Sequence, residues 1–81
     1  MLTREGARLQ VFLEVRRRYG ERRGPDELVI VDGQVREVPG GWVFPYTTRG
    51  YLEGDVRHAV GGNVPIFIDR ESGAMRPWTG Y

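Results

Sequence analysis

The spacing of apolar residues changes once along the chain, at a loop that contains glycines and a proline. Before this loop, Ala7, Val11 and Val15 recur every four residues, which is the spacing of one face of an α-helix. After it, from Leu28 onward, short β-branched and alternating runs are typical of strands. The loop itself, residues 20–26, marks the boundary between the two patterns. One helix followed by short strands predicts an α+β fold, in which the N-terminal helix packs on one face of a small antiparallel sheet.

The helix is expected over residues 3–19. Thr3 is a favoured residue type for the N-cap, and Gly20 suits the position after the last helical turn. Leu9 and Leu13 are expected to widen the apolar face. The helix therefore has defined ends and one side that is able to cover a sheet.

Asp32-Gly33 is expected to form a tight hairpin turn. The pair separates residues 28–31, which are mostly β-branched, from the second run, residues 34–38. An Asp-Gly pair between two such runs is a strong signal for a two-residue hairpin. The first two strands are therefore expected to pair with each other.

The next run, residues 42–48, alternates and places Trp42, Phe44 and Tyr46 on one face. Such a row either stacks nucleic-acid bases or forms the core under a helix, and we expect a core. Pro45 has no N–H to donate, which predicts an edge, a bulge or an unpaired position within this run.

A short second helix is expected between the strands. Gly54 or Asp55 would cap this helix, and Gly61-Gly62 would end it. After it, residues 66–69 and residues 74–76 are expected to pair as a second hairpin.

Residue types used in catalysis and metal binding are scarce. The 81 residues include no cysteine, one histidine (His58) and one serine (Ser72). No motif supports a triad of Ser72, His58 and an acid, and a zinc site would need more ligands than these. Neither a Gly-x-Gly-x-x-Gly nor a Gly-Lys-Ser/Thr phosphate loop occurs. We therefore expect that the protein is not an enzyme and that it has no catalytic residue, no cofactor and no metal.

Charge is distributed unevenly, although the formal net charge is only +1. Residues 1–25 hold seven arginines against three glutamates, a balance of +4, and residues 26–81 hold five arginines against eight acids, a balance of −3. The basic part suits either a solvated helix face and loop or a nucleic-acid surface, because arginine neutralises phosphates. Arg16, Arg17 and Arg18 are consecutive and point in three directions around a helix. The solvated face is the preferred interpretation.

No apolar run approaches the roughly 20 residues of a transmembrane helix. The charged N-terminal residues also lack the apolar stretch of a secretory signal. With no cysteine to form a disulfide, these features predict a cytoplasmic protein without a membrane partner.

Three short motifs follow one another in the second half of the chain. They are Gly-Trp-Val-Phe (Gly41–Phe44), Tyr-Leu-Glu-Gly-Asp (Tyr51–Asp55) and Gly-Asn-Val-Pro (Gly62–Pro65). In this order they resemble the immunity protein 35 family, the YrhB-like domains found beside bacterial polymorphic toxins. The resemblance spans most of the chain, so we expect residues 1–81 to form a single domain of this kind.

The resemblance implies a small antitoxin that binds a toxin domain encoded by a neighbouring gene and inhibits it sterically, without a small-molecule substrate. The toxins associated with the family include papain-like peptidase or deamidase domains. Loops on a rigid scaffold often make such contacts, and tyrosine, tryptophan and arginine are favoured at hot spots. The expected partner-binding residues are Arg49, Tyr51, Leu52, Glu53, Asp55, Trp78 and Tyr81.

Two other functions remain as alternatives. One is a chaperone-like module that shields apolar surfaces of other proteins, and the other, less favoured, is nucleic-acid binding through the arginine-rich N-terminal segment. A homodimer would need an open strand edge, at the run that contains Pro45 or at the last hairpin.

Overall fold

A computed structural model describes residues 1–58 and 64–79 of the chain. Its two helices are α1 (Arg4–Tyr19) and α2 (Arg49–Leu52), and its 3-10 turns are η1 (Gly24–Asp26), η2 (Asp32–Gln34) and η3 (Val56–His58). Its strands are β1 (Leu28–Ile30), β2 (Arg36–Val38), β3 (Gly41–Phe44), β4 (Tyr46–Thr48), β5 (Ile66–Asp69) and β6 (Met75–Pro77).

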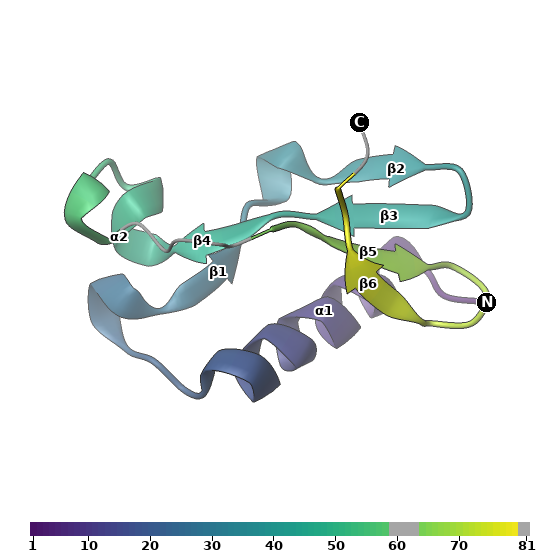
Figure 1. The fold of residues 1–81 in the computed structure, drawn as a ribbon, viewed down its shortest axis with the longest axis horizontal. Coiled ribbons are helices and arrows are strands. Elements are labelled where there is room, and N and C mark those ends of the chain that lie inside the picture. Colours follow the sequence, from purple (N-terminus) through teal and green to yellow (C-terminus); the bar gives the residue numbers. More distant parts are fainter. Residues whose placement is uncertain (59–63, 80–81) are drawn as a thin grey trace.

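The strands form two antiparallel sheets. The smaller sheet pairs β1 with β4, and the larger has the order β2-β3-β5-β6. Figure 1 shows α1 running along one side of both sheets, with α2 at one end of the molecule. The predicted α+β fold, with an N-terminal helix on antiparallel strands and a short second helix, is confirmed.

The helix α1 begins and ends as the sequence predicts. The Thr3 hydroxyl accepts a hydrogen bond from the Gly6 N–H at 3.0 Å, which satisfies one free donor of the first turn. Gly20 has a φ of 76°, a conformation that glycine adopts without steric cost. The residues of α1 that are fully buried against the sheets are Ala7, Val11 and Val15.

Leu9 and Leu13 do not widen the buried face, so that expectation is wrong. Their side chains are 56% and 54% exposed. Each lies two residues from Val11, which is a rotation of roughly 200° around the helix axis. The two leucines therefore stand on the side of α1 that faces away from the core.

The core forms between α1 and the aromatic row. Trp42, Phe44 and Tyr46 are all buried in one cluster with the apolar face of the helix, which confirms the predicted core. The Tyr46 hydroxyl lies 2.9 Å from the hydroxyl of Tyr19 at the end of α1. Burial, together with this hydrogen bond, raises the pKa of Tyr46.

Asp32-Gly33 does not form the predicted hairpin turn. A type I′ turn needs positive φ at both central residues, and neither Asp32 nor Gly33 has one. These residues lie instead in the 3-10 turn η2, after which β2 joins the other sheet. The Asp32 carboxylate accepts two hydrogen bonds from the Arg8 guanidinium of α1, at 2.7 and 3.0 Å. Instead of pairing with each other across this turn, β1 pairs with β4 and β2 pairs with β3.

The chain passes from one sheet to the other at Pro45. This single residue separates β3, which pairs with β2 and β5, from β4, which pairs with β1. Proline donates no ladder hydrogen bond, and the Pro45 carbonyl accepts one from the Val31 N–H at 2.9 Å. The predicted interruption of residues 42–48 at Pro45 is confirmed, since one run becomes two strands there.

At the position of the predicted second helix, directly after Asp55, the described residues form the 3-10 turn η3, and the Asp55 carboxylate accepts the Arg57 N–H at 3.0 Å. The helix α2 precedes this turn and was not predicted at its position. It begins at Arg49, with Thr48 as its cap. Residues 59–62, which include the expected helix end, lie outside the described residues.

The second hairpin forms as predicted. β5 pairs with β6, and the turn between them is held by the Asp69 carboxylate, which accepts the N–H groups of Glu71 at 2.8 Å and Ser72 at 3.0 Å. These backbone hydrogen bonds lower the pKa of Asp69. Pro77 is the last residue of β6, which lies at the edge of the larger sheet.

Gly41 is required by the close approach of β3 and β5. A Cβ atom at Gly41 would lie 2.0 Å from the Ile68 carbonyl oxygen, and this oxygen belongs to the sheet backbone and cannot move aside cheaply. We expect Gly41→Ala to lower the free energy of unfolding by about 2 kcal/mol or more, as overpacking of a filled site does. Urea unfolding followed by circular dichroism measures the change.

Gly33→Ala is the matched control. A Cβ atom at Gly33 would meet no atom of the described residues within 4 Å, and the φ of Gly33 is not positive. This variant should be neutral or up to about 1 kcal/mol more stable, because alanine restricts the unfolded chain. Equal effects of the two substitutions would contradict the close approach at Gly41.

Candidate functional site

Five of the predicted partner-binding residues lie in one short segment, Arg49–Asp55, which we call the α2 corner. The Thr48 hydroxyl accepts the Tyr51 N–H at 3.2 Å at the start of α2. At the other end, the Asp55 N–H donates to the Gly50 carbonyl at 2.9 Å, and Gly54 has a φ of 103° that suits glycine. The α2 corner is therefore a compact turn with both ends tied by hydrogen bonds.

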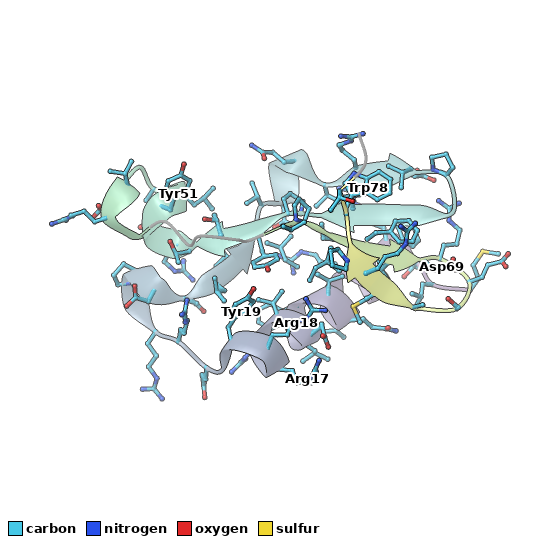
Figure 2. The ribbon with its side chains drawn as sticks, in the orientation of Figure 1. Arg17, Arg18, Tyr19, Tyr51, Asp69 and Trp78 are labelled. Carbon is cyan, nitrogen blue, oxygen red and sulfur yellow. The ribbon has the colours of Figure 1, made fainter. Side chains whose placement is uncertain are left out.

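Two large apolar side chains stand exposed on the α2 corner. Tyr51 is 45% exposed and Leu52 is 52% exposed, although they are neighbours in a helix that is only four residues long. Tyr51 lies at the end of the molecule that carries α2 (Figure 2). Together they form a small exposed apolar surface, and tyrosine is a residue type that is enriched at binding hot spots.

The charged residues of the α2 corner are already engaged in part. The Arg49 side chain forms an ion pair with Glu27, with its Nε 2.9 Å from Oε1, and this hydrogen bond raises the pKa of Arg49. The Asp55 carboxylate accepts hydrogen bonds from Arg57 at 2.9 and 2.7 Å. Glu53 is exposed. Arg49 and Asp55 therefore support the shape of the corner as well as its charge.

A cavity of about 270 Å³ lies beside α2. The described residues that line it are Val31, Gln34, Pro45, Tyr46, Thr47, Tyr51 and Leu52. Thr47 is 6% exposed, and its hydroxyl has no hydrogen-bond partner among the described residues. Neither Thr47 nor Gln34 is among the site residues predicted from the sequence. The alternation of β4 could have placed Thr47 opposite Tyr46, but no local pattern brings Val31 and Gln34 next to α2.

Trp78 lies elsewhere on the molecule. Its ring stacks on Phe67, with ring centroids 5.7 Å apart and an interplanar angle of 25°. The Arg76 guanidinium lies 4.6 Å from the centroid of Phe67. Figure 2 shows Trp78 over the larger sheet, well separated from Tyr51. The structure therefore does not bring Trp78 to the α2 corner, and Tyr81 lies outside the described residues.

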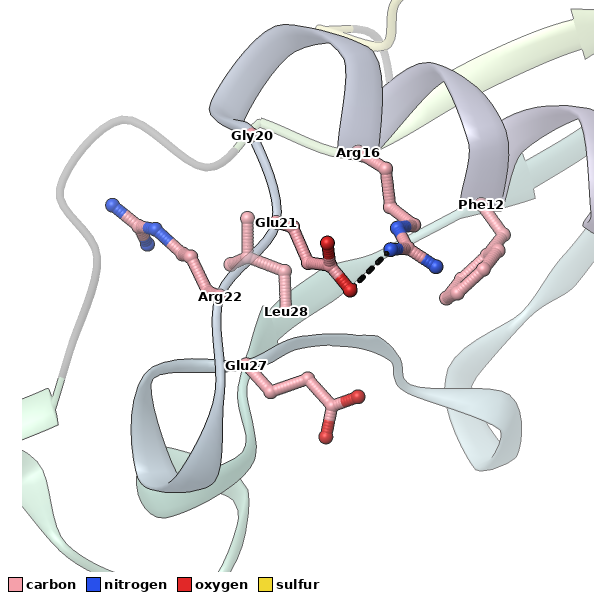
Figure 3. A pocket seen from close by; sticks show the side chains of 7 residues that line it. All are labelled: Phe12, Arg16, Gly20, Glu21, Arg22, Glu27 and Leu28. Carbon is pink, nitrogen blue, oxygen red and sulfur yellow. Dashed lines mark ion pairs between the residues drawn. The ribbon is translucent and has the colours of Figure 1, made fainter.

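A smaller cavity, of about 80 Å³, lies where the end of α1 meets the start of β1 (Figure 3). The Arg16 side chain crosses this cavity. Its Nη2 atom lies 3.1 Å from a carboxylate oxygen of Glu21, and its guanidinium lies 5.6 Å from the centroid of the Phe12 ring. The volume of this smaller cavity is less than a third of that of the cavity beside α2. The cavity is therefore a poor candidate for a ligand site.

The arginines at the end of α1 are also largely engaged within the chain. Glu14 accepts hydrogen bonds from Arg17 at 2.9 and 2.7 Å and from Arg18 at 2.7 Å. These hydrogen bonds lower the pKa of Glu14 to about 2. A carboxylate shared by two guanidinium groups competes with phosphates for them, which weighs against this surface as a nucleic-acid site.

Residues that could perform chemistry do not converge in the described part of the chain. Residues 1–58 and 64–79 contain no group of three or more histidine, cysteine or acidic side chains that could hold a metal ion. The Ser72 hydroxyl accepts the Ala74 N–H at 3.1 Å within the last turn. In the same residues, no helix combines the length and the hydrophobicity that crossing a bilayer requires.

Comparison with known proteins identifies the family. The family model described as immunity protein 35 matches residues 7–79. The chain belongs to the immunity protein 35 family. The match covers both helices in large part, all six strands and the α2 corner, and the family name implies an immunity protein that binds a cognate toxin. No curated protein and no solved structure matched the chain.

The charge cluster around Glu14 in this immunity protein 35 domain should make its stability depend on acid pH. Because the pKa of Glu14 is lowered to about 2 in the folded state, the stabilisation is fully present above the ordinary carboxyl pKa of about 4.3 and is lost as the pH falls through this lowered pKa. We expect Glu14→Gln to cost about 0.5 kcal/mol at neutral pH, and the difference from the parent protein to shrink steadily as the pH is lowered from 4 toward the folded-state pKa.

Denaturant unfolding at a series of pH values measures this difference. Glu71→Gln is the control, because Glu71 is exposed and its hydrogen bond to Asp69 runs through its backbone N–H. The interpretation is wrong if Glu14→Gln shows the same small, pH-independent effect as Glu71→Gln.

Proposed function

We propose that the protein is a steric inhibitor that binds its cognate toxin domain through the α2 corner. The single observation that carries the proposal is the pair of exposed neighbours Tyr51 and Leu52, held on a turn that is tied at both ends. Membership of the immunity protein 35 family supplies the kind of partner. The protein would act in the cytoplasm of the cell that makes the toxin.

The composition of the α2 corner supports a protein partner. Hot spots are enriched in tyrosine and arginine and lie at the centre of an interface, surrounded by groups that exclude water. Tyr51 and Leu52 would supply that centre, and the ion pairs of Arg49 with Glu27 and of Asp55 with Arg57 would form its polar rim. The exposed Glu53 would speed association with a basic toxin surface.

Steric inhibition needs no chemistry from the inhibitor. The proposal therefore requires neither a catalytic residue nor a cofactor of this chain, only a surface that covers the active site of the toxin. The family resemblance implies a papain-like peptidase or deamidase domain as the target. Such a domain would be inhibited by occlusion of its substrate cleft.

Leu52→Ala and Tyr51→Ala should each weaken toxin binding at least tenfold, about 1.4 kcal/mol, because each removes an exposed apolar anchor. Isothermal titration calorimetry with an inactive variant of the toxin domain encoded by the neighbouring gene measures the dissociation constant.

Leu13→Ala is the matched control. Leu13 is the same residue type as Leu52, sits on α1, and is 54% exposed against 52% for Leu52. It should leave binding within about twofold, since surface substitutions outside an interface have little effect. The assignment to the α2 corner is wrong if Leu52→Ala and Tyr51→Ala bind the toxin domain as tightly as the parent protein does. It is also wrong if Leu13→Ala weakens binding as much as they do. No complex with the parent protein would remove the toxin-inhibitor function altogether.

A further inference from the structure

We propose that the protein forms a symmetric homodimer through the outer side of α1, with the two helices antiparallel. The contact surface is the row Glu5, Leu9, Leu13 and Arg17, which we call the α1 row. Its occupant is the same row of a second copy of the chain. The proposal goes beyond the toxin-inhibitor function and does not depend on it. It is carried by the spacing, the exposure and the order of charges along the row.

The α1 row is one continuous ridge on the helix surface. Its residues follow one another at intervals of four, so their side chains are neighbours along α1. The row lies on the side of α1 that faces away from the sheets, opposite the buried residues of the helix. Ridges of this spacing pack against each other in the commonest class of helix pairs, with the helix axes about 8–10 Å apart. The row therefore has the geometry that a second helix requires.

The centre of the α1 row is apolar and open. Leu9 is 56% exposed and Leu13 is 54% exposed, so no described part of the chain covers them. If Leu9 of one copy packs against Leu13 of the other, two-fold symmetry repeats the same contact. Four leucine side chains would then lose contact with water together, which favours association.

The charges at the ends of the row suit only an antiparallel pair. Glu5 precedes Leu9 by four residues, and Arg17 follows Leu13 by four. The two pairs have the same midpoint, so the rotation that joins Leu9 to Leu13 also places Glu5 of each copy opposite Arg17 of the other. In a parallel pair, like charges would meet at both ends and the helix dipoles would point the same way. The row is therefore complementary to itself in one orientation.

Both charged groups are available for this contact. Glu5 is exposed, and no described residue forms an ion pair with it. The Arg17 side chain is 72% exposed, and it binds Glu14 through Nε and Nη2. Because a guanidinium has five N–H donors, the Nη1 of Arg17 remains for Glu5 of the second copy. A formal net charge of only +1 per chain opposes association little.

The strand edges of the described residues offer less to a second copy. The strands β1, β2, β4 and β6, which lie at the sheet edges, have three residues each. Pro77, at the end of β6, has no N–H to donate. A pair of such edges would form few backbone hydrogen bonds. The α1 row is therefore a better dimer surface than the last hairpin or the run that contains Pro45.

Charge reversal tests the contact by sedimentation equilibrium. A single helix face is a small interface, so the parent protein should be measured from about 10 µM to about 1 mM, where a weak dimer becomes populated. Glu5→Arg and Arg17→Glu should each weaken the dimer at least tenfold, because like charges then meet twice. Glu53→Arg is the matched control. It changes the net charge as Glu5→Arg does, at an exposed position of the α2 corner, and should leave the dimer intact.

Combining the two reversals tests the orientation. The mixture of the Glu5→Arg and Arg17→Glu variants should form a heterodimer, because each variant then meets the opposite charge. The double variant that carries both reversals should dimerise like the parent protein only if the helices are antiparallel, since a parallel pair would still bring like charges together. All four positions of the α1 row are exposed, and circular dichroism checks that each variant keeps its helix.

Leucine truncation separates this inference from the proposed function. Leu13→Ala should weaken the dimer about tenfold and leave toxin binding within twofold, whereas Leu52→Ala should do the reverse. The dimer is wrong if the parent protein stays monomeric up to about 1 mM, or if Glu5→Arg weakens it no more than Glu53→Arg does. The antiparallel contact is wrong if the double variant is monomeric. These results leave the toxin-inhibitor function standing, and a parent dimer that binds no toxin domain would refute that function alone.

Discussion

The packing of α1 on the aromatic row of β3 and β4 holds the molecule together. Trp42 and Phe44 belong to the larger sheet and Tyr46 to the smaller one, yet all three face the same helix. A two-stranded sheet such as β1-β4 is at best marginally stable alone. It persists here because the helix covers it as part of a core that it shares with the larger sheet, and because Tyr46 meets Tyr19 at the end of α1.

The break at Pro45 gives the proposed site its place in the fold. Since β4 leaves the larger sheet there, its end at Thr48 is free to cap α2 and to set the α2 corner at one end of the molecule. The same break leaves Pro45 and Val31 as walls of the cavity that Tyr51 and Leu52 border. The position of the surface proposed to bind a toxin thus depends on the break at Pro45, which divides the strands between two sheets.

The candidate site could be predicted only where its residues are contiguous. Tyr51 and Leu52 lie on one turn because they are neighbours in the chain, and the sequence identified them together. Trp78 was grouped with them as a hot-spot residue type, but it stacks on Phe67 over the other sheet. Thr47 and Gln34 were missed, since their nearness to α2 depends on how β1, η2 and β4 pack. Residue type alone therefore identified candidate residues for binding but did not group them into one surface.

The sequence by itself determined the features whose causes are local. The start of α1 follows from the capping residue Thr3, and the aromatic row follows from the alternation of residues along a strand. The second hairpin follows from a turn in which Asp69 accepts hydrogen bonds from residues next to it in the chain. Only the tertiary structure decided the partners of the strands. Asp32-Gly33 has the composition of a hairpin turn, but β1 finds its partner in β4, and Arg8 of α1 holds Asp32. Both contacts join residues far apart in the chain, and a local pattern carries no information about them.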